Sequence, residues 1–176
     1  MVAEGTTGQQ APYRAGDDRL IQADADGNRK LRRQRVDADL IVAGGGLSGV
    51  CCAVAAAREG VRVALVQDRP VLGGNASSEV RLWVLGATAH MSNNNRWARE
   101  GGIVDEILVE NLWRNPEGNA ILFDAVLLDV VAAEPNLDLF LNTAISEVTV
   151  SPSGEIAAIH GFNSQNSIRY DFFLPG

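Results

Sequence analysis

The stretch of sequence that most constrains the fold is GGGLSG, residues 44–49. Before it, residues 37–43, DADLIVA, form a short apolar run of the kind a parallel strand buried on both faces shows. After it, VCCAVAAAREG carries small residues that let a helix lie close to a sheet, and Gly60 ends that helix. Residues 61–66, VRVALV, form the next strand. Together these segments predict a right-handed βαβ unit.

Three glycines in this turn match the GxGxxG pattern of a dinucleotide site. Gly44 permits the tight turn out of the strand, Gly46 lets the backbone approach a pyrophosphate, and Gly49 lets the helix pack against the sheet. The phosphates then meet the N-terminus of the helix over residues 47–58, where free N–H groups and the macrodipole favour negative charge. The alternative is a glycine turn that serves close packing only.

Gln67 stands at the end of the second strand, where a dinucleotide-binding domain ordinarily has a carboxylate for the ribose. A glutamine amide still forms such a contact, without charge assistance. In one reading, Asp68 or Gln67 binds an unphosphorylated ribose; in the other, Arg69 admits the 2′-phosphate of NADP. We favour the first, because Asp68 would repel a phosphate.

A second glycine pair, Gly73 and Gly74, follows directly in RPVLGGNASSEVR. A plain NAD domain does not need glycines at this point, and they permit another close backbone approach to a long cofactor. The alternative interpretation is an ordinary loop.

The rest of the chain predicts two helices and several strands. Apolar spacing indicates an amphipathic helix over residues 103–113 and a second helix over 119–133. A strand follows at 137–143, and residues 145–174 predict an antiparallel meander. We therefore expect an α/β, Rossmann-like FAD/NAD(P)-binding fold with a parallel sheet and a meander. Residues 1–35 form a disordered arm in this interpretation, and 36–176 a single domain that is incomplete at its C-terminus.

Composition excludes several classes of function. Of 176 residues, 46% are hydrophobic and 6% aromatic, and the net charge is −7, which disfavours disorder, membrane insertion and a nucleic-acid partner. The two cysteines, Cys51 and Cys52, are adjacent and indicate no disulfide framework, so a cytoplasmic location is expected. No metal site is expected from two histidines far apart in the sequence.

The run LVQDRPVLGGNASSEVR, with EGGIVDEILVEN and NLDLFLNTAISEV, resembles the FAD-dependent oxidoreductases related to the fumarate reductase and succinate dehydrogenase flavoproteins. The likeness extends over roughly residues 37–174. It implies extended FAD and redox chemistry at the flavin ring. By position the resemblance implies contacts with four parts of FAD. It assigns the pyrophosphate to Gly44, Gly45, Gly46, Ser48 and Gly49, the adenosine ribose to Gln67, Asp68 and Arg69, the pyrophosphate and flavin side to Gly73, Gly74 and Asn75, and the adenine to the backbone of Ile145.

Candidates for catalysis are few. His90 is a possible acid or base, and Arg81 a possible clamp for a substrate carboxylate or phosphate. Family members continue into a TGDG-type motif beyond a strand like IRYDFFL, so a fragment of a larger oxidoreductase is expected, with a small-molecule substrate and an electron acceptor that the sequence does not identify. The alternatives are an NAD(P)-dependent oxidoreductase and a non-catalytic nucleotide-binding fragment or subunit.

Overall fold

The computed structural model describes residues 21–23, 30–85 and 98–174. The strands are β1 (Ile21–Ala23), β2 (Lys30–Asp37), β3 (Leu40–Ala43), β4 (Val63–Val66), β5 (Leu137–Phe140), β6 (Thr143–Val150), β7 (Ile156–Asn163) and β8 (Ile168–Phe173). The helices are α1 (Leu47–Arg58), α2 (Gly102–Arg114) and α3 (Ala120–Ala132), with a short 3₁₀ helix, η1 (Gly74–Ala76). Among these helices none is both long and apolar enough to cross a membrane.

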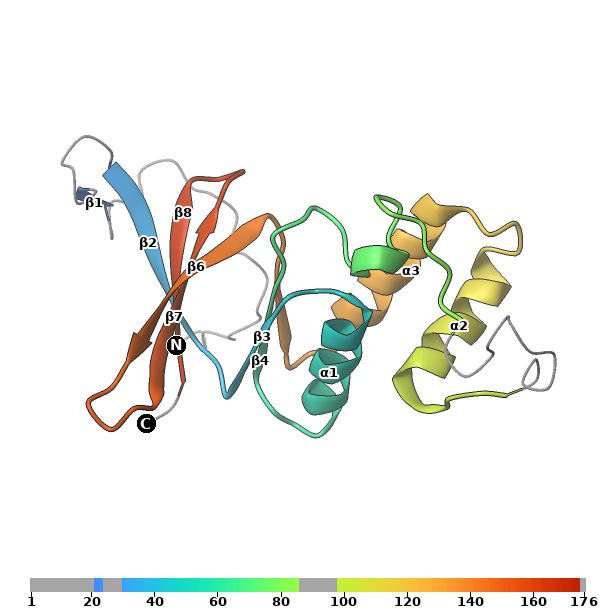
Figure 1. Ribbon diagram of the computed structural model, residues 1–176, viewed down its shortest axis with the longest axis horizontal. Helices are drawn as coiled ribbons and strands as arrows, with labels where there is room; N and C mark the ends of the chain where they lie inside the picture. Colours follow the sequence, from blue (N-terminus) through green and yellow to red (C-terminus); the bar gives the residue numbers. More distant parts are fainter. Residues whose placement is uncertain (1–20, 24–29, 86–97, 175–176) are drawn as a thin grey trace, which may run out of the picture.

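The elements form three layers, with a parallel sheet in the middle (Figure 1). This sheet has the order β3-β4-β5 and all its strands run the same way. Helices α1 and α3 cover one face, and α2 packs against these two helices on the side away from the sheet. A second sheet of order β1-β2-β8-β7-β6 covers the other face. Because β4 lies between two strands and two layers, all four of its residues are buried.

Two apolar cores hold the layers together. On the helix side, α1 contributes Val50 and Val54, α3 contributes Leu127, and β4 contributes Leu65, all fully buried. Each such side chain stabilises the fold by about 1.5–3 kcal/mol. Arg58 adds a polar tie, because its guanidinium pairs with Glu106 of α2 and with Glu134 beyond α3, each at 2.7 Å. The C-terminal end of α1 is thereby joined to α2 and to the residues that follow α3.

Between the two sheets lies an aromatic core. Phe140 of β5 meets Tyr170 and Phe172 of β8 edge-on, with ring centroids 5.0 Å apart in both pairs. Ala64 and Val66 of β4 complete this core. Because side chains alternate along a strand, Val63 and Leu65 of β4 face the helices, and the other two residues of the strand face the second sheet.

The structure confirms the expected fold class and most of its elements. The helix predicted over residues 47–58 is α1, the helices predicted over 103–113 and 119–133 correspond to α2 and α3, and the predicted meander is β6-β7-β8. The strand predicted over residues 37–43 is divided, however. β2 ends at Asp37, buried Ala38 carries the chain from one sheet to the other, and β3 begins at Leu40.

The prediction of a disordered arm over residues 1–35 is wrong where the structure describes that segment. Residues 21–23 form β1, and residues 30–35 form most of β2, which pairs in parallel with β8. The reason is a tertiary partner. Arg33 donates to the Asp171 carboxylate at 2.8 Å, and the Arg35 guanidinium lies 4.0 Å from the centroid of the Phe173 ring. Such cross-strand contacts stabilise a basic segment that has no apolar periodicity of its own.

Asp138 generates a pH-dependent prediction. It lies in β5, and burial raises the pKa of its carboxyl above the ordinary value. A raised folded pKa means that stability falls as the pH rises from the unfolded pKa of about 4 through the folded pKa. Asp138→Asn is therefore expected to raise the free energy of unfolding at neutral pH, and to have little effect well below pH 4. Urea unfolding of both proteins across this pH range measures the difference; a pH-independent difference would contradict the burial account.

Candidate functional site

The glycine turn that connects β3 to α1 needs residues without side chains. Gly44 has φ +116°, a conformation that L-residues rarely adopt, and its N–H donates to the Val66 carbonyl at 2.8 Å. A Cβ on Gly49 would overlap the Gly44 carbonyl oxygen. The first turn of α1 is therefore packed directly against the backbone that leaves β3, as the GxGxxG pattern predicts.

The second glycine pair lies against this first turn. The Gly73 N–H donates to the Gly45 carbonyl at 2.8 Å, and Gly46 and Gly73 form an isolated parallel bridge. A Cβ built on Gly74 would lie 3.2 Å from the Gly46 Cα, tighter than an ordinary contact. Residues 44–49 and 73–75, here called the first and second glycine loops, thus form one continuous backbone surface. The sequence predicted a close backbone approach to a cofactor at the second loop, and this stays a prediction. The structure shows that the second loop approaches the backbone of the first loop.

Helix α3 fixes the second glycine loop from behind. Leu127 lies so close to Gly73 that a Cβ there would come within 2.7 Å of its Cδ1. The Ser78 N–H donates to the Asp124 carboxylate at 2.9 Å, and the Ser77 hydroxyl donates to the Gly74 carbonyl at 2.7 Å. The position of this loop therefore depends on the helix layer.

Gln67 is buried between the two loops, with 5% of its surface exposed. Its Oε1 accepts from the Gly45 N–H at 2.8 Å, and its Nε2 donates to the Val71 carbonyl at 3.0 Å. The carboxamide thus bonds the first loop to the segment that leads into the second. Asp68, the next residue, is exposed, and Arg69 lies 4.0 Å from its carboxylate. Of the acid and the amide considered for the ribose, only Asp68 presents its side chain to solvent.

The N-terminus of α1 is suited to an anion. Its N-cap is Gly46, which offers no side-chain cap, and the first turn carries no acidic residue. Gly46 has an ordinary φ of −62°, and a Cβ on it would meet no atom within 4 Å. The space in front of this residue is open, and the N–H groups and dipole of the first helical turn favour negative charge there.

A groove of about 790 Å³ begins at this open space. Gly46, Ser48, Gly73 and Asn75 line its polar end. Its far wall is apolar and comes from Leu82, Trp83, Val84 and Leu85, which follow the second glycine loop, and from Val104 of α2. No sequence motif described above includes residues 82–85. The sequence feature that could have indicated this wall is the apolar run LWVL directly after GGNASSEVR. In the structure most of its side chains are exposed.

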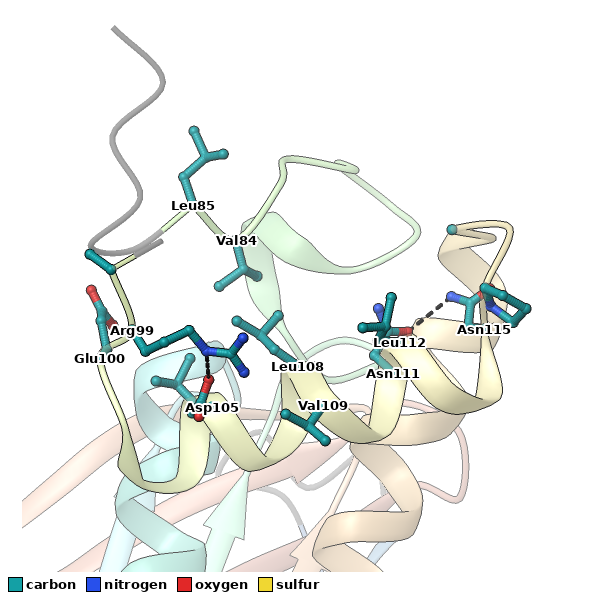
Figure 2. A pocket seen from close by; sticks show the side chains of 14 residues that line it. Val84, Leu85, Arg99, Glu100, Asp105, Leu108, Val109, Asn111, Leu112 and Asn115 are labelled. Atoms are coloured by element: carbon teal, nitrogen blue, oxygen red, sulfur yellow. Dashed lines mark hydrogen bonds and ion pairs between the residues drawn. The ribbon is translucent and has the colours of Figure 1, made fainter. Parts of the chain in front are cut away.

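Two further hollows adjoin this groove and share Val84 with it. Val84, Leu85, Leu108 and Val109 line the hollow that lies along α2, which has a volume of about 370 Å³. In Figure 2 Val84 points toward Leu108 of the helix, whereas Leu85 points away from it. At its ends Arg99 donates to Asp105 at 2.7 Å, and Asn115 donates to Asn111 at 3.0 Å. The groove therefore continues from the glycine loops across an apolar wall to α2.

Cys51 lines the groove one turn into α1. Burial, and secondarily the neighbouring Cys52, raise the pKa of its thiol above the ordinary value. The thiol therefore stays protonated at neutral pH. Cys51 therefore contributes a small neutral side chain to the groove near the N-terminus of α1, and no nucleophilic thiolate.

The remaining candidates are placed as follows. Arg81 lies at φ +66° after the second loop, its Nε donates to the Ser78 carbonyl, and it lines the second hollow beside Trp83. Ile145 lies in β6, two residues after Thr143, whose N–H donates to the Gln67 carbonyl at 2.9 Å. His90 falls outside the described residues. The roles of these residues stay predictions.

Comparison with known proteins identifies a family. The model of the family described as FAD dependent oxidoreductase matches residues 39–172. No curated protein matches the chain.

Solved structures similar to this chain include adenylylsulfate reductase from Archaeoglobus fulgidus, at 15% identity and a TM-score of 0.49, covering 89% of this chain and 32% of that one. L-proline dehydrogenase from P. horikoshii is 14% identical with a TM-score of 0.46, and the match covers 81% of this chain and 22% of that one. p-Nitrophenol 4-monooxygenase PnpA from Pseudomonas putida DLL-E4 is 11% identical with a TM-score of 0.45, and the match covers 80% of this chain and 40% of that one. The chain thus spans less than half the length of these structures.

Gly49 generates a prediction about the fold of the site. Gly49→Ala is expected to lower the free energy of unfolding by about 3 kcal/mol, the upper end of overpacking costs, because the methyl group meets backbone that cannot rotate away. Ser48→Ala, at the exposed neighbouring position, is the control and is expected to stay within about 0.5 kcal/mol of the unmodified chain. Chemical denaturation followed by circular dichroism measures both; equal stabilities would show that the turn and α1 are not packed as described.

Proposed function

Because the chain belongs to the FAD-dependent oxidoreductase family, we propose that it forms the FAD-binding part of an oxidoreductase, with the pyrophosphate of FAD at the two glycine loops. The observation that carries this proposal is the joined backbone surface of Gly45, Gly46, Gly73 and Gly74. One glycine turn suffices for a mononucleotide half-site. A second turn bonded to the first extends that surface along the length of a longer cofactor.

The residues present fit this cofactor. The cradle depends on missing side chains, since a Cβ at Gly45 would lie 2.7 Å from Leu72 Cδ2 and one at Gly73 would crowd Leu127. At Gly46, by contrast, a side chain would meet no protein atom and would occupy the open end of the groove. A glycine with free space in front of it, at a helix N-terminus, supports direct approach of a phosphate to the backbone.

Each part of the cofactor has a proposed partner. The N–H groups of the first turn of α1 and the Ser48 hydroxyl bind the pyrophosphate. The exposed Asp68 carboxylate accepts hydrogen bonds from the adenosine ribose, and Arg69 lies beside it. The backbone near Ile145 lies toward the adenine, and Asn75 toward the flavin.

When bound, FAD supplies two-electron redox chemistry, accepting a hydride from a substrate and passing electrons to an acceptor. In this proposal the chain itself binds FAD, orients it in the groove and shields the flavin from water. Leu82, Trp83 and Val84 form the apolar wall of the groove. Trp83 is 86% exposed, so a bound flavin would cover it, and in this proposal the wall then shields the flavin from water. Arg81, which lies next to this wall, is the proposed contact for an anionic group of a small-molecule substrate.

A second candidate function is a cofactor-binding unit whose substrate-handling residues lie in another part of the protein. One observation favours it. Among the described residues that line the groove at the glycine loops there is no histidine or lysine, and Glu100 is the one carboxylate. In both candidates the chain binds FAD; they differ in whether this chain alone supports turnover.

Gly46 tests the proposed function directly. Gly46→Asp is expected to keep the fold for three reasons. A φ of −62° suits any residue, a Cβ at this position would have no protein atom within 4 Å, and aspartate is a favourable N-cap. It is expected to weaken FAD binding about 10- to 1000-fold, because its charge faces the phosphates at close range. Visible absorption and quenching of flavin fluorescence measure binding, and thermal unfolding measures the fold.

Gly46→Asn is the matched control, similar in size and in capping ability but neutral. It is expected to weaken FAD binding less than Gly46→Asp does, because it adds bulk without charge. Equal FAD affinity in the unmodified chain and in Gly46→Asp would show that the pyrophosphate does not bind in front of Gly46.

A further inference from the structure

Gln67 occupies the position where the sequence suggests a ribose ligand, yet its side chain is buried and bonded on both sides. We propose that Gln67 is a positioning residue, whose carboxamide holds the first glycine loop in the conformation that receives the pyrophosphate, and that it does not contact the ribose. This inference rests on the proposed function, since it concerns how the chain prepares its FAD site.

The groups that surround the carboxamide account for the choice of an amide. On one side stands a donor, the Gly45 N–H, at 2.8 Å from Oε1; on the other stands an acceptor, the Val71 carbonyl, at 3.0 Å from Nε2. A glutamine offers both an acceptor and a donor in one plane, whereas an ionised glutamate offers acceptors only. A carboxylate at this position would set one of its oxygens against the Val71 carbonyl.

The backbone of Gln67 is itself anchored, so the side chain acts from a fixed point. Its N–H donates to the Phe140 carbonyl at 2.9 Å, and its own carbonyl accepts from the Thr143 N–H at 2.9 Å. The side chain also fills the space beside Gly45, because a Cβ on that glycine would come within 3.0 Å of the Gln67 Cβ. Burial, two polar contacts and close packing therefore all direct Gln67 toward the first loop.

The hydrogen bond from Gly45 to Gln67 also fixes the position of the neighbouring residue, Gly46, at the proposed pyrophosphate site. Gly45 is the residue before the N-cap Gly46, and its carbonyl receives the Gly73 N–H of the second loop. The Gly45 peptide groups are thus held by Gln67 on the N–H side and by the second loop on the carbonyl side. Loss of the Gln67 contact would therefore make the position of Gly46, where the pyrophosphate approaches, less fixed. In this proposal the ribose is bound by the exposed acid, Asp68, and not by Gln67.

The ribose and bracing roles predict opposite effects for one substitution. If Gln67 contacted the ribose, Gln67→Glu would strengthen FAD binding, because a carboxylate accepts from both ribose hydroxyls with charge assistance. If Gln67 braces the loop, Gln67→Glu weakens FAD binding about 5- to 100-fold at a pH of about 8, because a buried acceptor loses its donor. Affinity then recovers as the pH falls to about 5, since a protonated carboxyl again offers a donor and an acceptor.

Two further variants separate bracing from simple charge repulsion. Gln67→Met is neutral and of similar length, and bracing predicts weaker FAD binding at every pH, whereas repulsion alone predicts no effect. Gln165→Glu adds the same charge at an exposed position in the β7–β8 turn, where the acceptor that receives the Asn142 amide is retained. It is expected to leave FAD affinity and its pH profile unchanged.

The experiment measures FAD dissociation constants for the 176-residue chain and these variants by flavin fluorescence, at several pH values. Weakened binding in Gln67→Glu with recovery at acid pH, together with weakened binding in Gln67→Met, supports the proposal. Unchanged or tighter binding in Gln67→Glu, absence of recovery, or unchanged binding in Gln67→Met overturns it.

A measurement without ligand keeps this proposal separate from the proposed function. In the FAD-free chain, amide hydrogen exchange at Gly45 is expected to accelerate in Gln67→Met, while Gly44, whose N–H donates to the Val66 carbonyl, keeps its protection. If the unmodified chain binds no FAD, the proposed function fails and this exchange experiment still decides the brace. Unchanged exchange at Gly45 would show that Gln67 does not hold the loop.

Discussion

The contact on which the site depends is the backbone hydrogen bond from the Gly73 N–H to the Gly45 carbonyl. It brings two loops, separated by a helix and a strand in the sequence, to a distance that excludes side chains at several positions. Gly45, Gly73 and Gly74 each have a neighbour within 3.2 Å of where a Cβ would stand. Glycine at these positions is thus a steric requirement of the contact between the two loops, and this contact joins them into one backbone surface, at which we propose the pyrophosphate of FAD binds.

The layers of the fold hold this contact in place from three directions. The parallel sheet fixes the first loop at the end of β3, α1 packs on it through Gly49, and α3 supports the second loop through Leu127 and Asp124. The aromatic core between the sheets holds β4 and β5 against β8. The position of the two glycine loops consequently depends on packing in the two cores, and a change in this packing is expected to affect the proposed FAD site.

Local patterns predicted what depends on local interactions. Helix α1 begins at Leu47 and ends at Arg58 as expected, because the glycine turn before it and Gly60 after it are themselves the start and stop signals. β2 was missed because its stability comes from β8, about 135 residues later in the chain, through pairs such as Arg33 with Asp171.

The role of Gln67 shows a different limit. The residue type at the end of β4 was apparent from the sequence, and so was its departure from the usual acid. Its partners were not, because Gly45 and Val71 approach the amide only after both loops have folded. The apolar wall at residues 82–85 was overlooked for a similar reason, since its position beside the glycine loops follows from the path of the chain after η1.

The measurement that tests the central claim most directly is an FAD titration of the isotope-labelled chain followed by amide NMR. The account predicts that the largest shifts occur at the amides of both glycine loops, residues 45–49 and 73–75, and that they saturate together with one dissociation constant. Shifts confined to other parts of the chain, such as α2, or shifts at one loop without the other, would contradict a single cofactor site built from the two loops.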